Sequence, residues 1–192
     1  MNIITCRFIL VILLIGCSSS IVAQEKLEKE YRIRLNQVPQ PALDYVSTYN
    51  FQKVKWYAEE SLKGISIEAK ARTNKKYFSI EFDKNGILED VEITINKAVI
   101  VGDANKNINQ YLDENFRRYR IRKIQQQFSG NPKDIRDLIK NKTINPVTIK
   151  YELIVKGKDS SGVYLYELLF NDKGKLEQRS KIIFRNSDNL EY

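Results

Sequence analysis

The chain has 192 residues, and its 32 Lys and Arg against 24 Asp and Glu give a net charge of +8. It contains no histidine, and its two cysteines, Cys6 and Cys17, lie within the first 17 residues. The lack of histidine removes the commonest general base and the commonest zinc ligand. Because no cysteine follows residue 17, the rest of the chain has no thiol nucleophile, disulfide or cysteine-based metal site.

Residues 1–24 have the pattern of an export signal. Arg7 is their only charged residue, and an unbroken apolar run of nine residues extends from Phe8 to Gly16. This run is too short to cross a bilayer, which needs about 20 apolar residues. We therefore expect an exported protein without a transmembrane segment in its mature part.

Two processing outcomes follow from the residues at the end of this signal. Leu14-Ile15-Gly16-Cys17 resembles a bacterial lipobox, in which Cys17 would be acylated and become the N-terminus. Alternatively, the small residues ending at Ala23 resemble an ordinary signal-peptidase site. The first outcome predicts a lipid anchor, and the expected location is the periplasm, the outer-membrane surface or the medium.

Two pairs of segments recur at one offset of 88 residues. Tyr31-Arg32-Ile33-Arg34 returns at 119–122, and the segment from Phe82 to Glu89 returns at 170–177. A shared offset indicates two copies of one supersecondary unit. The predicted organisation is therefore a signal peptide at 1–24, a first unit at 25–100 and a second unit at 101–192.

The first unit begins with a short helix, because Pro39 and Pro41 suit a first helical turn. Alternation of apolar and polar residues then predicts four strands, and Asn85-Gly86 marks a hairpin turn between the third and the fourth. The strands are expected at 53–57, 65–72, 77–82 and 91–95.

In the second unit, the apolar spacing of residues 105–118 predicts a helix, and another follows Pro132. Strands are predicted at 147–155, 163–170 and 176–184. Arg179 takes the place that apolar Val91 has in the first unit, so we expect a bulge or register shift near Gln178. The strand at 163–170 is apolar on both sides, which indicates a covered surface or an interface.

Together these signals predict an α+β fold. It is a tandem repeat of short helices followed by a four-stranded antiparallel sheet, fused into one curved sheet with helices on one face.

A Val38-Pro39-x-x-Ala42 helix start is followed by a strand around Trp56 and by an aromatic-x-x-x-Gly-x-Leu-Glu hairpin at 82–89. This pattern resembles the PepSY-like domains of bacterial envelope proteins, which share the fold of β-lactamase inhibitor proteins. The resemblance covers most of residues 30–185 and implies an open concave sheet face that contacts a partner protein. It implies no catalytic motif.

The sheet face opposite the core carries mixed charges and tyrosines, a composition suited to protein binding. An ordinary solvated sheet face is the alternative. The candidate binding residues are Lys53, Lys55, Tyr57, Arg72, Tyr77, Lys150, Leu165 and Arg179.

The positive charge is uneven, because residues 25–104 have a net charge of zero and residues 105–192 carry +7. Basic runs with aromatics suggest nucleic acid in a cytoplasmic protein, but export favours an acidic protein, anionic glycans or lipid head groups. A charged edge strand that resists aggregation explains the run equally well. Its densest part is Arg117, Arg118, Arg120, Arg122 and Lys123.

Catalytic, cofactor and metal sites are not predicted. Ser160 and Ser161 have no histidine to activate them, and Glu89 and Asp90 point to opposite faces of a strand. Asp83, Asn85 and Glu89 depart from the spacing of a calcium loop. We therefore expect a non-enzymatic protein-binding module that inhibits or modulates an envelope enzyme. The alternative is a carrier or scaffold with an apolar pocket for a small or anionic ligand between sheet and helices.

Overall fold

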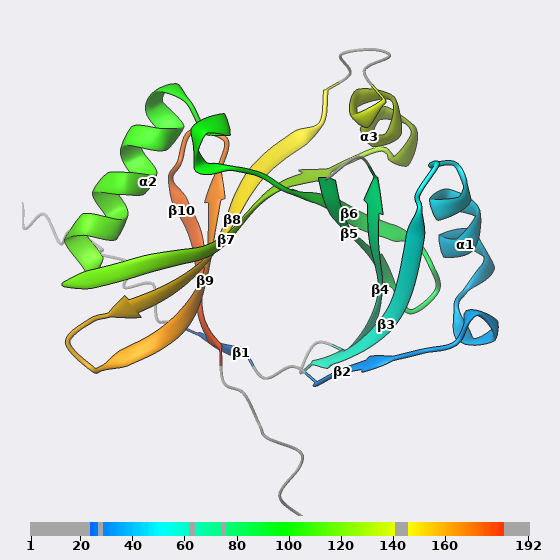
Figure 1. Cartoon of the computed structure of the whole chain (residues 1–192), viewed down its shortest axis with the longest axis horizontal. Coiled ribbons are helices and arrows are strands. Elements are labelled where there is room, and N and C mark those ends of the chain that lie inside the picture. The colour runs from blue at the N-terminus through cyan, green and yellow to red at the C-terminus, as the bar shows by residue number, and fades with distance from the viewer. Residues whose placement is uncertain (1–23, 27–28, 62–63, 74–75, 141–145, 183–192) are drawn as a thin grey trace, which may run out of the picture.

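The computed structural model describes residues 24–26, 29–61, 64–73, 76–140 and 146–182 (Figure 1). Three α-helices and two short 3-10 helices accompany ten strands. The helical elements are η1 (Leu35–Gln37), α1 (Gln40–Ser47), η2 (Lys97–Val99), α2 (Gly102–Asn115) and α3 (Pro132–Ile139). The strands are β1 (Gln24–Lys26), β2 (Lys29–Arg32), β3 (Lys53–Ser61), β4 (Gly64–Thr73), β5 (Lys76–Asp83), β6 (Leu88–Thr94), β7 (Arg118–Ser129), β8 (Thr148–Lys158), β9 (Val163–Asn171) and β10 (Leu176–Ile182).

All ten strands belong to one sheet, in the order β1-β10-β9-β8-β7-β6-β5-β4-β3-β2. Neighbouring strands are antiparallel except for β1, which runs parallel to β10. The two edge strands, β1 and β2, are consecutive in the sequence. Three peptide units separate Lys26 from Lys29, so their Cα atoms lie at most about 11 Å apart. The two edges of the sheet therefore approach each other, and the sheet curls around an inner face (Figure 1).

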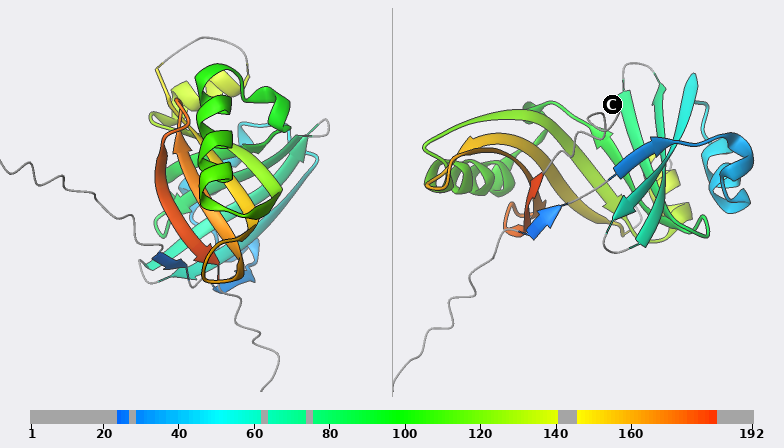
Figure 2. Two further views of the ribbon diagram at one scale, coloured as in Figure 1. Left: turned by 90° about the vertical axis from the view of Figure 1, so that its left-hand side faces the viewer. Right: turned by 90° about the horizontal axis from the view of Figure 1, so that it is seen from below.

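The three helices lie on the outer side of this curved sheet (Figure 1 and Figure 2). Helices α1 and α3 cover one apolar cluster, which includes Trp56, Ile80 and Phe82 of the sheet. Helix α2 covers a second cluster, in which Leu112 packs with Tyr166 and other residues of β8 and β9. The hydrophobic core thus lies between the helices and the outer face, whereas the inner face from β3 to β7 carries mainly polar and charged side chains.

The predicted fold class is wrong, because the described residues do not form a repeat of helices followed by four-stranded sheets. The sheet continues without a break from β6 to β7, where Val91 to Thr94 pair with Phe128 to Gln125. Helix α3 also crosses the expected boundary. It follows β7, yet its fully buried Ile135 packs into the cluster formed by β3 to β6. The pairing of β6 with β7 therefore joins the two halves of the chain into one sheet, and the burial of α3 connects their cores.

Two hairpin glycines fix the helices against the sheet. Gly86 has φ +84°, and a Cβ atom there would lie 2.8 Å from Cβ of Pro39 at the start of α1. Gly174 has φ +76°, and its Cβ would lie 2.4 Å from the carbonyl oxygen of Ala104 in α2. Glycine is required at both turns, because it tolerates positive φ and allows the backbones to approach closely.

Among the described helices, none combines the length and the apolar composition needed to cross a bilayer. Residues 1–23 of the expected signal peptide, including Cys17, fall outside the described residues, and Gln24 begins β1.

Candidate functional site: the concave face

We call the inner face of the sheet, which points away from the three helices, the concave face. Successive side chains of a strand point to opposite faces. Trp56, Ala69 and Ile80 pack under the helices, so their neighbours in sequence occupy the concave face. The register places Tyr57 beside Glu68, and Glu68 beside Glu81, across β3, β4 and β5.

A cleft of about 450 Å3 opens on the concave face between β3 and β7, and we call it the cationic cleft. Tyr77 contributes an aromatic side chain to its wall, and Glu68 is the one carboxylate among its described lining residues. Five cations line it: Lys53, Lys55, Lys70, Arg72 and Lys123.

Only one of these five cations is neutralised by ion pairs within the described residues. Lys70 Nζ lies 2.5 Å from Glu30 Oε2 and 3.2 Å from Glu68 Oε2, and it also stands 4.7 Å from the centre of the Tyr57 ring. No described carboxylate forms an ion pair with Lys53, Lys55 or Arg72. The cleft therefore presents uncompensated positive charge next to the aromatic side chain of Tyr77.

Three carboxylates gather beside this cleft, and we call Glu81, Asp90 and Glu92 the carboxylate cluster. Each offers an oxygen atom, and these oxygens lie within 4.8 Å of one another. The strand register explains the proximity, because Glu81 is paired with Asp90 across β5 and β6. Glu92 follows Asp90 by two residues and so shares its face.

Burial raises the pKa of Glu81 well above its ordinary range, and repulsion from Asp90 and Glu92 adds to the increase. Burial also raises the pKa of Glu92, which is only 3% exposed. Repulsion from Glu152 and Asp90 acts in the same direction, whereas the positive charge of Lys123 partly offsets it. By itself, the carboxylate cluster thus favours bound protons over three negative charges.

Two glutamines of β7 contact the carboxylate cluster. Gln125 Nε2 donates a hydrogen bond of 2.5 Å to Glu92 Oε2. Gln127 Nε2 lies 3.1 Å from Asp90 Oδ2 and 3.3 Å from Glu92 Oε1, so it bridges two of the carboxylates. Gln125 is 3% exposed, and its Oε1 has no hydrogen-bond partner among the described residues.

The structure brings four of the predicted binding residues together in the cationic cleft, namely Lys53, Lys55, Arg72 and Tyr77. Tyr57 neighbours them through its contact with Lys70. Lys150 and Leu165 do not line this cleft, and the strand register places them on the concave faces of β8 and β9. The Lys150 ammonium is 2.8 Å from Glu177 Oε2, so its charge is already compensated.

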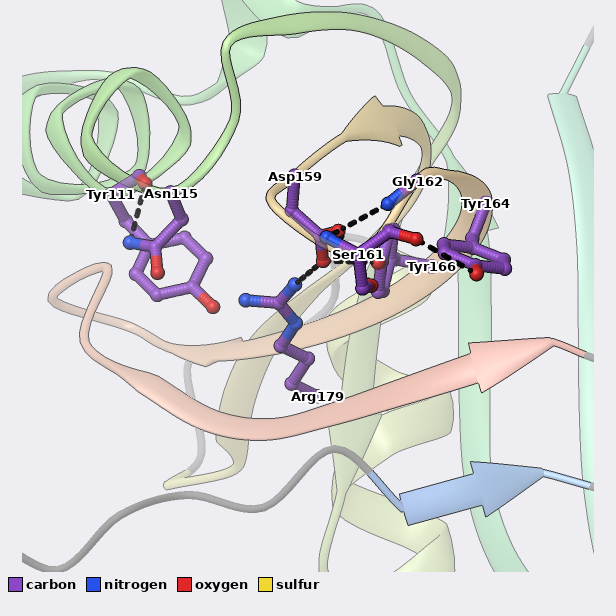
Figure 3. A network of polar contacts seen from close by, with 8 residues as sticks. All are labelled: Tyr111, Asn115, Asp159, Ser161, Gly162, Tyr164, Tyr166 and Arg179. Atoms are coloured by element: carbon purple, nitrogen blue, oxygen red, sulfur yellow. Dashed lines mark hydrogen bonds and ion pairs between the residues drawn. The ribbon is translucent and has the colours of Figure 1, made fainter.

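The predicted place of Arg179 on the concave face is wrong. Its guanidinium lies on the helix side, 5.1 Å from the Phe116 ring and 4.6 Å from the Tyr166 ring. It also forms an ion pair of 2.9 Å with Asp159 Oδ2 (Figure 3). The expected bulge, between Leu176 and Gln178, is the physical reason, because it reverses the alternation of faces along β10.

Asp159 is the centre of this network on the helix side (Figure 3). Its Oδ2 accepts a hydrogen bond of 2.5 Å from the Tyr166 hydroxyl, and its Oδ1 accepts one of 2.8 Å from the Ser161 backbone N–H. Burial alone would raise the pKa of Asp159, but these hydrogen bonds and the Arg179 charge hold it well below its ordinary value. The network fastens the β8–β9 turn to β10.

The basic run at the start of β7 does not form one patch. Lys123 lines the cationic cleft, whereas Arg117 lies beside Asp159 and Phe116 in a separate hollow. Arg118, Arg120 and Arg122 are exposed along the strand between them. The five cations are thus distributed over two regions of the surface.

Sequence reasoning missed the carboxylate cluster, although a signal for it was present. Asp90 and Glu92 are two residues apart in a strand and must share a face. The Asn85-Gly86 hairpin folds β5 back on β6, which places Glu81 opposite Asp90. The glutamines could not be anticipated, since the pairing of β6 with β7 has no local signature.

Comparison of the chain with protein-family models, curated proteins and solved structures finds no match. The resemblance to PepSY-like domains therefore stays a prediction. The fold and the concave face define the chain as an α+β protein with a highly curved, mostly antiparallel sheet and a charged inner surface.

Proposed function

We propose that this protein is an exported, non-enzymatic binding protein, and that its cationic cleft holds an acidic segment of an envelope or extracellular protein. The observation that carries this proposal is the group of Lys53, Lys55 and Arg72, which lack ion pairs among the described residues and adjoin Tyr77. Aromatic residues and arginine supply much of the binding energy at protein interfaces. Clustered charge of one sign attracts a partner of the opposite sign.

An acidic loop of an enzyme is one such segment, and holding it would inhibit or modulate that enzyme. This role needs shape and charge only, which agrees with a chain that has no histidine. The proposal includes export, since residues 1–24 have the pattern of a signal peptide.

A defined probe tests the cleft. A fluorescent peptide of alternating Glu and Tyr is titrated with the protein, and its anisotropy is followed at low and at high salt. We expect saturable binding that weakens with salt, because the attraction is electrostatic. The double variant Lys55→Glu/Arg72→Glu should bind at least about tenfold more weakly, which corresponds to roughly 1.4 kcal/mol.

The matched control is Arg118→Glu/Arg120→Glu, which changes the net charge equally at the far end of β7. It should keep the affinity within about threefold, a difference of less than 1 kcal/mol. Equal losses in the two variants would show that only net charge matters, and the cleft would then not be the site.

One observation favours the ligand-carrier alternative. A hollow of about 340 Å3 lies where the ends of α1 and α3 meet the sheet, and Phe51, Ile93 and Ile139 contribute apolar walls. An apolar anion such as anilinonaphthalene sulfonate tests it by fluorescence. Binding that Ile139→Trp abolishes and Arg72→Glu preserves would support a carrier, and the reverse pattern would support the cationic cleft.

A further inference from the structure

We propose that the carboxylate cluster of Glu81, Asp90 and Glu92 binds a divalent cation, with the amide oxygen of Gln125 as a further ligand. Calcium is the cation that this set of oxygen ligands favours. This inference does not depend on what occupies the cationic cleft.

The first argument is the arrangement of the oxygens. Ca2+ binds oxygen ligands at about 2.3–2.6 Å, so two ligands on opposite sides of the ion are roughly 4.6–5.2 Å apart. The three carboxylate oxygens lie within 4.8 Å of one another, and they can therefore surround one such ion. Mg2+ gives up its water molecules reluctantly and is seldom held by protein ligands alone, whereas Ca2+ accepts several carboxylate and amide oxygens in a flexible geometry.

The second argument is the buried side-chain amide of Gln125, which is not one of the acidic residues. Gln125 is 3% exposed, and its amide is held against the cluster by the hydrogen bond from Nε2 to Glu92 Oε2. Its Oε1 has no partner among the described residues. A buried carbonyl oxygen without a partner is unfavourable, and a hard cation is a natural partner for an amide oxygen.

The third argument is charge. Within the described residues, neither Glu81 nor Glu92 forms an ion pair with Lys or Arg. Glu68 and Glu152 repel the Glu81 carboxylate as well. A divalent cation would compensate this concentration of negative charge, and it would compete with the protons that the cluster otherwise favours.

Isothermal titration calorimetry of the mature protein with CaCl2 and MgCl2 at neutral pH tests the site. We expect one Ca2+ per chain, with weaker binding of Mg2+. Glu92→Gln should lower the calcium affinity at least tenfold, and Gln125→Leu should lower it as well. Glu89→Gln is the matched control, because Glu89 is exposed on the same strand and its carboxylate is not part of the cluster.

Thermal unfolding provides the second readout and does not depend on the heat of binding. Calcium should raise the melting temperature of the wild type and of Glu89→Gln, but not that of Glu92→Gln. Emission of Trp56, buried under α1, shows whether each variant is folded. The proposal is overturned if the wild type shows no saturable binding up to roughly 10 mM CaCl2, about tenfold above the range of weak extracellular calcium modules. It is also overturned if Glu89→Gln loses as much affinity as Glu92→Gln.

Discussion

Glu81 on β5 stands directly opposite Asp90 on β6, and both side chains project from the concave face. Like charges in directly opposed positions destabilise a sheet. Glu92, two residues farther along β6, adds a third carboxylate on the same face. Negative charge is therefore concentrated at this point of the concave face, and burial raises the pKa values of Glu81 and Glu92 there.

The first prediction concerns pH in the absence of divalent cations. The folded-state pKa values of Glu81 and Glu92 are raised above the ordinary value of about 4.3. Above that pH the native state therefore binds more protons than the unfolded state, and stability falls as pH rises. We expect the melting temperature, measured with EDTA by Trp56 fluorescence, to decrease from about pH 5 to neutrality.

Several charged groups face these two carboxyls and set the size of that effect: Glu68, Asp90, Glu152, Glu167 and Lys123. The variant Glu92→Gln removes one titrating group, so its melting temperature should depend less on pH and should exceed that of the wild type at neutrality. A wild-type melting temperature that rises over this interval would contradict the prediction.

The second prediction concerns Asp159, whose folded-state pKa is lowered. Its stabilising contribution is present above its unfolded pKa of about 3.9 and is lost as pH falls toward the lowered folded value. Asp159→Asn should therefore destabilise the protein by about 1–3 kcal/mol near neutral pH, and the difference should shrink in acid. Urea unfolding at several pH values measures this, with Asp172→Asn in the β9–β10 turn as the control.

The third prediction concerns the contact between the β9–β10 turn and α2. Gly174→Ala would combine an unfavourable positive φ with a clash against the Ala104 carbonyl oxygen, so we expect a loss of about 2–4 kcal/mol. Gly102 also has a positive φ, +61°, but a Cβ atom added there would have nothing within 4 Å. Gly102→Ala should thus cost only about 1–2 kcal/mol, and equal losses in urea unfolding would exclude a role for the α2 contact.

The fourth prediction separates the two apolar sides of β9. Leu168 is fully buried under the helices, whereas Leu165 is half-buried on the concave face. Leu168→Ala should destabilise the protein by about 2–5 kcal/mol. Leu165→Ala should cost no more than about 1 kcal/mol, because it buries less apolar area. Chemical denaturation of both variants provides the comparison, and a larger loss at Leu165 would contradict this assignment of the core.

The cleft residues were predictable because β3, β4 and β5 pair without a register shift through Lys53, Lys55, Arg72 and Tyr77. In such strands the alternation of the sequence alone assigns each side chain to a face. The face of Arg179 could not be predicted in this way, because a bulge between Leu176 and Gln178 precedes Arg179 in β10. The aromatic rings that Arg179 contacts belong to Phe116 at the end of α2 and to Tyr166 on β9, and its carboxylate partner, Asp159, lies in the β8–β9 turn. The sequence of β10 does not specify these contacts.

The fold class could not be derived from local patterns for a similar reason. Periodicity indicated most strands, but it does not determine which strands pair. The pairing of β6 with β7 and the packing of Ile135 from α3 into the first cluster are contacts between distant parts of the chain. Strand β1 is only three residues long and pairs in parallel with β10, so it carries no periodic signal.

The short covalent connection between Lys26 on β1 and Lys29 on β2 limits the distance between the two edges of the sheet. Because three peptide units span at most about 11 Å, the ends of β1 and β2 can separate only up to that distance while the pairing of β1 with β10 is kept. Residues inserted between Lys26 and Lys29 would therefore allow the two edges of the sheet to separate further.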